Sequence, residues 1–176
     1  MNLSTVNDFE LLGLPQQFTL DMAQLQQAWK ALQQQAHPDK HVHADAATQR
    51  QAMQWAVRIN EAYQRLKHPL QRAAYLCELY GHPIQAEDNT AMSGPFLMQQ
   101  MQWREALDDA QQDELALEAL LQEVKGEQSR LMQTLAQTLD SGHGSGLPVA
   151  VQAVRASMFV QKLIEQIQHK LEALDA

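Results

Sequence analysis

Apolar residues recur at helical spacing along most of the chain. In the stretch that begins near residue 21, one helix face is formed by Leu25, Trp29, Leu32 and Ala36, which fall at i, i+4, i+7 and i+11. The composition agrees with this pattern, because Gln, Ala, Leu and Met dominate and all four are good helix formers. Only seven glycines and six prolines interrupt the chain. These features predict an all-α fold.

Helix-stopping residues divide the first 80 residues into four predicted helices. Their expected ranges are about 8–12, 21–37, 44–67 and 69–80. Gly13 and Gly81 end the first and the last of them. The second helix opens with a cap at Asp21 and must end before Pro38, because the residue before a proline disfavours helical geometry. Pro69 separates the third helix from the fourth and suits the first position of the fourth.

The rest of the chain predicts a linker and three longer helices. Residues 81–94 are polar between turn-prone ends, which is typical of a linker. The three helices are expected at about 95–109, 113–139 and 148–174, and the last two are joined by the flexible run SGHGSG at 141–146. Short connections of this kind favour an antiparallel three-helix bundle. The expected domains are therefore residues 1–80 and 95–176, with the linker at 81–94.

Charge and cysteine content exclude several classes of function. The formal net charge is −8 and no long basic run is present, which argues against nucleic acid as the main partner. The single cysteine, Cys77, excludes an internal disulfide and lies on the apolar side of its helix, so it is expected in the core of a protein from the reduced cytoplasm. No signal peptide is visible, and no apolar run approaches the roughly 18 residues needed to span a membrane.

The most informative local motif is the tripeptide His37-Pro38-Asp39, followed by Lys40, between the second and third predicted helices. Pro38 fixes φ and so limits the chain entropy lost on docking. Asp39 offers a charged acceptor to an arginine of a partner, and His37 adds a donor and an acceptor. The motif contains no nucleophile, so it indicates a rigid surface for binding a protein and not a catalytic centre.

Several segments resemble J-domain proteins of the HscB type, the co-chaperones of iron–sulfur cluster assembly. The matching segments are residues 9–15 (FELLGLP), 35–40 (QAHPDK), 59–63 (INEAY), 66–75 (LKHPLQRAAY), 96–98 (FLM) and 104–108 (REALD). The resemblance covers nearly the whole chain, and the order of domains agrees. It implies an N-terminal J-domain hairpin with short flanking helices and a C-terminal bundle. Zinc-binding cysteine pairs of some eukaryotic relatives are absent, which favours a bacterial-type member.

The resemblance also implies partners and a role. The J-domain would stimulate the ATPase of HscA, a chaperone of the DnaK class, and the bundle would hold IscU, the iron–sulfur scaffold protein. No cofactor, metal or enzymatic activity of its own is implied. The residues expected to contact the chaperone are His37, Pro38, Asp39, Lys40 and Lys30. Lys30 is the only base in the second helix, whereas this helix is usually rich in Lys and Arg in J-domains.

A second apolar surface is predicted on the helix at 95–109. At about 100° per residue, Phe96, Trp103, Leu107 and Ala110 share one face, and Leu97, Met98 and Met101 lie on the other side. Periodicity alone leaves two interpretations open, since the helix could bury both faces or expose the second one. The HscB resemblance implies that the second face binds the scaffold protein through Leu97, Met98, Met101, Gln102, Glu105 and Asp109, together with Phe159 of the last helix.

Three other hypotheses remain open at the level of sequence. The first is a J-domain co-chaperone that serves other clients, although the chain has no Gly/Phe-rich segment or zinc-binding cysteine array. The second is a helical adaptor without chaperone activity. The third is a metalloenzyme whose metal site is formed by His37, His41 and His43, flanked by Asp39 and Asp45. It is disfavoured because the loop gives these ligands no common face.

Overall fold

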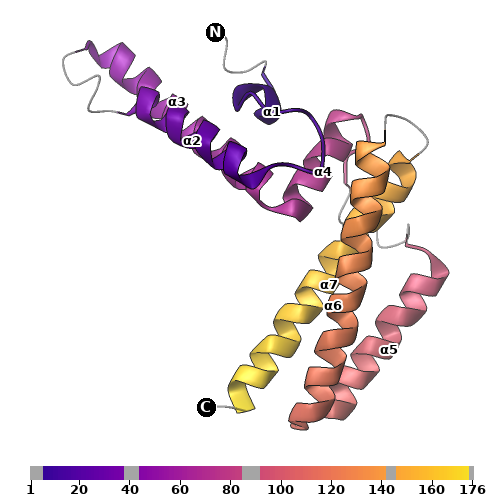
Figure 1. The fold of residues 1–176 in the computed structure, drawn as a ribbon. Coiled ribbons are helices and arrows are strands. Elements are labelled where there is room, and N and C mark those ends of the chain that lie inside the picture. Colours follow the sequence, from indigo (N-terminus) through magenta and orange to yellow (C-terminus); the bar gives the residue numbers. More distant parts are fainter. Residues whose placement is uncertain (1–5, 38–43, 85–91, 142–145, 175–176) are drawn as a thin grey trace. The chain divides into compact units, whose positions relative to one another are not determined.

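All regular elements of the described residues are α-helices. The computed structural model describes residues 6–37, 44–84, 92–141 and 146–174 (Figure 1). Within these ranges the predicted all-α class is confirmed. Packing divides the chain into two compact units, residues 1–76 and 77–176. None of the helices in the described ranges is both long and apolar enough to cross a membrane.

Two long helices form a hairpin in the first unit. They are α2 (Met22–Ala36) and α3 (Ala46–Lys67), which lie side by side in Figure 1. The short α1 (Asp8–Leu11) precedes the hairpin, and α4 (Pro69–Leu79) follows it and contains the division between the two units. All four helices agree with their predicted ranges to within two residues.

Local sequence explains where these helices begin and end. The carboxylate of Asp21 caps α2 by accepting the backbone N–H groups of Ala23 and Gln24 at 2.8 and 3.3 Å, as its sequence position predicts. A full capping box lies at α1, where Asn7 and Glu10 accept each other's backbone N–H groups, and sequence analysis missed it. Gly13 ends this segment with a φ of 64°, a conformation that favours glycine.

The interior of the hairpin is only partly filled along the predicted face of α2. Leu25 is fully buried near its start, and Ala36 is buried at its end. Between them Trp29 is half-buried and stacks on Tyr63 of α3, with 4.6 Å between ring centroids, and Leu32 is half-buried as well. The face predicted from periodicity is therefore correct in direction but incompletely covered in its middle, at Trp29 and Leu32.

A buried carboxylate ties α1 to the hairpin. Asp8 is fully buried and forms ion pairs with Arg58 at 2.5 Å and Arg65 at 2.9 Å, both from α3. Its backbone N–H donates to the hydroxyl oxygen of Tyr75 at 3.1 Å. Burial raises the pKa of Tyr75 and keeps the phenol neutral. We call Asp8, Arg58 and Arg65 the aspartate anchor.

The second unit contains three long helices. They are α5 (Gly94–Ala110), α6 (Glu114–Asp140) and α7 (Leu147–Leu174). The two longest, α6 and α7, pack along each other, and α5 lies beside α6 (Figure 1). Their shared core is formed by Trp103, Leu107, Ala110, Leu117, Leu120, Leu121, Val124, Val160, Leu163, Ile164 and Ile167. Each helix matches its predicted range to within one residue.

Cys77, near the end of α4, is fully buried. Burial raises the pKa of its thiol to about 11, so the thiolate is scarcely populated at neutral pH. The sequence-based expectation that Cys77 is a core residue is confirmed.

Candidate functional site

The first candidate site lies at the end of the hairpin. Helix α2 ends at Ala36, and the exposed His37 follows it in an extended conformation with φ −60° and ψ 129°. Pro38 explains this end, because it disfavours helical geometry in the residue before it. His37 is thus placed at the tip as predicted, whereas Pro38, Asp39 and Lys40 lie outside the described residues.

Lys30 and Asp45 are two charged residues of the hairpin that bear on this site. Lys30 is exposed on α2, six residues before the end of that helix, and its contact with a chaperone stays a prediction. Asp45 caps α3 by accepting the backbone N–H of Thr48 at 2.7 Å, and this hydrogen bond lowers the pKa of Asp45. Asp45 is therefore the N-cap of α3.

The proposed histidine cluster falls largely outside the described residues, because His41 and His43 are among those not described. In the part of the chain that the structure describes, no three His, Cys, Asp or Glu side chains are grouped so as to hold a metal ion. The hypothesis of a metal site in this loop stays a prediction.

The second candidate site is the face of α5 that points away from the core of its unit. Leu97, Met98 and Met101 are exposed by 40, 65 and 71% respectively. Their exposure decides between the two interpretations that periodicity left open, since the helix does not bury both faces. The neighbouring polar residues Gln102, Glu105 and Asp109 are exposed too. We call these six residues the methionine patch.

The opposite face of α5 is fixed to the bundle. Trp103 is buried, and its indole N–H donates to Oε1 of Glu123 on α6 at 2.8 Å. Near the C-terminal end of α5, Nζ of Lys170 on α7 donates to the carbonyl oxygen of Leu107 at 3.0 Å. These bonds tie α5 to both neighbouring helices and so hold the methionine patch outward. Sequence analysis missed Glu123 and Lys170, because nothing in their local pattern marks them.

Phe159 has a different environment from the rest of the predicted scaffold-binding set. It is half-buried and stacks on Trp103 with 6.5 Å between ring centroids, and it meets the edge of Phe96 at 6.1 Å. Both contacts are with the packed face of α5. The guanidinium of Arg104 lies 5.6 Å from its ring centroid. Phe159 therefore supports α5 from the core side, and Arg104 covers the ring.

The sequence matches two protein-family models that together span most of the chain. Residues 7–75 match the DnaJ domain, and residues 92–168 match the HSCB C-terminal oligomerisation domain. The first match contains the hairpin, and the second contains α5 and most of the bundle.

Whole-chain relatives show the same combination. The co-chaperone protein HscB homolog of Bordetella pertussis is 48% identical over 90% of this chain and 92% of its own length. The homolog of Ralstonia nicotianae is 46% identical, with 99% of each chain covered.

Solved structures of this family have the same fold. The chaperone HscB from Vibrio cholerae superimposes with a TM-score of 0.81 at 35% identity, covering 96% of this chain and 99% of that one. The human co-chaperone protein HscB gives a TM-score of 0.86 at 25% identity, covering 94% and 82%. HscB proteins are co-chaperones and not enzymes, and a J-domain implies a partner chaperone of the DnaK class. The chain belongs to the HscB family of J-domain co-chaperones of iron–sulfur cluster assembly.

Proposed function

We propose that the chain stimulates the ATPase of HscA, a DnaK-class chaperone, and delivers the scaffold protein IscU to it. The His-Pro-Asp tripeptide is the contact with the chaperone, together with Lys30 and Lys40. The methionine patch is the contact with IscU, together with the part of the half-buried Phe159 ring that stays accessible. The J-domain comprises residues 1–80, and the client-binding bundle comprises residues 95–176. The protein acts in the bacterial cytoplasm.

The observation that carries this proposal is the exposure of the methionine patch. Its two methionines are among the most exposed large apolar side chains of the described residues. A stable fold gains nothing from exposing them, whereas a flexible thioether side chain adapts well to the irregular surface of a partner. Glu105 and Asp109 border the patch and would favour basic groups on that partner.

The chemistry of delivery follows from the two contacts. The tripeptide stabilises the chaperone conformation that hydrolyses ATP, which is a population shift driven by differential contact. The patch brings IscU to the same chaperone molecule, so that client loading and hydrolysis coincide. Linking two binding events through one chain raises the effective concentration of the second.

A coupled ATPase assay tests this function. HscA is measured alone, with the chain, with IscU, and with both. The proposal expects stimulation by the chain alone and a larger stimulation with both than the sum of the separate effects. If the effects of the chain and IscU on the ATPase rate are only additive, the delivery role is wrong. If the chain does not stimulate HscA at all, the assignment of HscA as its partner is wrong.

A second copy of the chain is the competing occupant of the patch, because the matching family model is described as an oligomerisation domain. Sedimentation of the chain alone separates the two. If the chain forms a dimer, and if the double variant Leu97→Ala with Met101→Ala is a monomer, the patch binds a second copy.

A further inference from the structure

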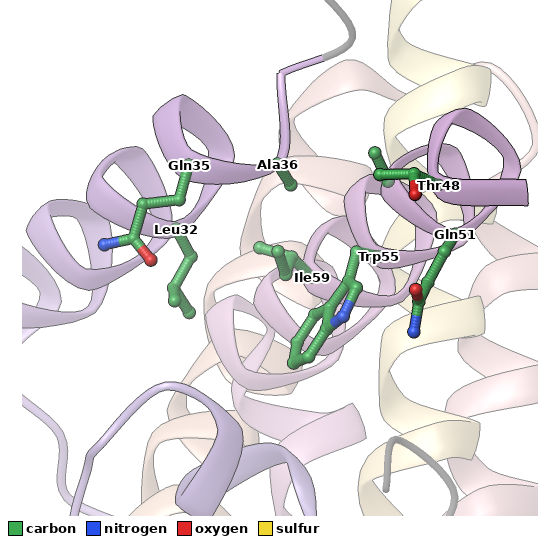
Figure 2. Close-up of a pocket in the computed structure, with 8 residues that line it drawn as sticks. Leu32, Gln35, Ala36, Thr48, Gln51, Trp55 and Ile59 are labelled. Atoms are coloured by element: carbon green, nitrogen blue, oxygen red, sulfur yellow. The ribbon is translucent and has the colours of Figure 1, made fainter. Parts of the chain in front are cut away.

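A pocket opens between α2 and α3 at the end of the hairpin that leads to the tripeptide (Figure 2). Its volume is about 320 Å³. An apolar cavity of about 150 Å³ already binds benzene, so this pocket has room for one large apolar side chain. We call it the hairpin pocket, and its lining residues are Leu32, Gln35, Ala36, Thr48, Gln51, Ala52, Trp55 and Ile59.

Two small buried residues leave room for the pocket between the helices. Ala36 and Ala52 are buried at 8 and 6% exposure, yet each contributes only a methyl group to the space between α2 and α3. Ile59 is buried as well. Leu32 and Trp55 extend from the two helices and stay half-buried, so their apolar surface is incompletely covered (Figure 2). Apolar surface left in this state gains free energy when another apolar group covers it.

One wall of the pocket lies next to the tripeptide in the chain. Gln35 and Ala36 line it, and His37 follows directly. Consecutive Cα atoms are about 3.8 Å apart, so a partner bound to His37 lies within side-chain reach of the α2 wall of the pocket.

The low positive charge of α2 favours an apolar contact with a partner on this helix. Lys30 is the single basic residue of α2, which leaves little electrostatic attraction for docking on this helix. An apolar contact beside the tripeptide supplies binding free energy that charge does not.

We propose that the hairpin pocket receives one apolar side chain of the DnaK-class chaperone while the tripeptide binds it. This inference rests on the proposed function and adds a specific contact to it. The side chain enters between Leu32 and Trp55 and covers their half-buried apolar surface. The pocket contact determines the affinity of the chain for the chaperone, whereas the tripeptide determines the maximal ATPase rate.

Ala52→Leu tests the inference, because Ala52 lines the pocket and a leucine side chain at this position would occupy part of its space. ATPase stimulation of HscA is titrated with the variant and with the parent chain. The concentration giving half-maximal stimulation is expected to rise about tenfold, with the maximal rate retained. Trp55→Ala is expected to raise this concentration similarly, because it removes a large apolar side chain from the α3 wall of the pocket. A half-maximal concentration unchanged in both variants would overturn the inference.

Two controls separate docking from folding. Val57→Ala removes an apolar side chain that is 58% exposed on the same helix and does not line the pocket, so stimulation should be unchanged. Thermal unfolding is measured for every variant, and Ala52→Leu should melt no lower than the parent because it fills space. If Ala52→Leu does not fold, the inference is tested by the half-maximal concentration of Trp55→Ala alone.

The failure of this inference and the failure of the proposed function give different results. If Asp39→Asn still stimulates HscA fully, the proposed function fails. If Asp39→Asn abolishes stimulation while both pocket variants act like the parent chain, only the hairpin pocket loses its role. If Ala52→Leu instead alters the sedimentation of the chain alone, the pocket binds a second copy and the inference is overturned.

Discussion

Asp39 is the single residue on which chaperone stimulation should depend most. A carboxylate pairs with a guanidinium through charge-assisted hydrogen bonds, and an amide of the same shape does not supply the charge. Asp39→Asn should therefore reduce stimulation of HscA about tenfold or more at a fixed concentration. The matched control is Asp45→Asn, in the same interhelical connection, because asparagine caps a helix as well as aspartate does. Equal activity of the Asp39 variant and the control would contradict the assignment.

Asp8 should matter for stability and not for binding. Removing it leaves Arg58 and Arg65 beside a cavity that no longer holds an opposite charge. Both arginines reach solvent in part, so Asp8→Ala should lower the free energy of unfolding by about 2–3 kcal/mol. Urea denaturation followed by circular dichroism measures this loss. Asp108→Ala, at an exposed acid of α5, is the control, and a loss below about 0.5 kcal/mol for Asp8→Ala would show that the aspartate anchor is dispensable.

Sequence predicts some of these residues and not others for a physical reason. Asp21 and Gly13 act on their own neighbours, so their effects as helix signals are visible in the local pattern. The burial of Asp8 depends on arginines about 50 residues away, and the bond from Trp103 to Glu123 joins two helices. Contacts of this kind exist only once the tertiary fold brings the partners together.

At the scale of elements, α5 illustrates the limit of periodicity. The spacing of about 100° per residue correctly separates the packed face with Trp103 and Leu107 from the face with Met98 and Met101. It cannot say whether a neighbouring helix covers the second face, because that depends on how many helices the bundle places around α5. Phe159 shows the same limit, since resemblance groups it with the patch while its ring packs on the core side.

The methionine patch can be tested as a unit of α5. Leu97→Ala with Met101→Ala should weaken IscU binding about tenfold or more, because both side chains lose apolar contact area. The melting temperature should be unchanged, since both residues are exposed. Isothermal titration calorimetry gives the affinity. Leu115→Ala with Val149→Ala removes two exposed apolar side chains, at 78 and 50%, from other helices of the same unit and should leave the affinity unchanged. Equal affinities for the two double variants would contradict the role of the patch.

At the scale of the whole molecule, the two proposed contacts belong to different packing units. The tripeptide lies in residues 1–76 and the methionine patch in residues 77–176. Substitutions in one unit that are distant from those in the other usually act independently. The two contacts should therefore be separable in the intact chain.

A crossed experiment measures this separation. Asp39→Asn should bind IscU with the affinity of the parent chain while failing to stimulate HscA. Leu97→Ala with Met101→Ala should stimulate HscA normally without IscU and lose the extra stimulation that IscU adds. Both affinities and both rates are measured on each variant. A loss of IscU binding in the Asp39 variant would mean that the units are coupled.

The exposure of Met98 and Met101 makes their thioether groups accessible to oxidants. Oxidants convert an exposed thioether to a sulfoxide, which is polar and chiral, and sulfoxide reductases reverse the change. Mild peroxide treatment should therefore weaken IscU binding, and enzymatic reduction should restore it, with mass spectrometry locating the added oxygen. If the affinity survives full oxidation of both side chains, their apolar character is unimportant. Client capture by this co-chaperone would thus follow the oxidant exposure of the cell, with no cysteine involved.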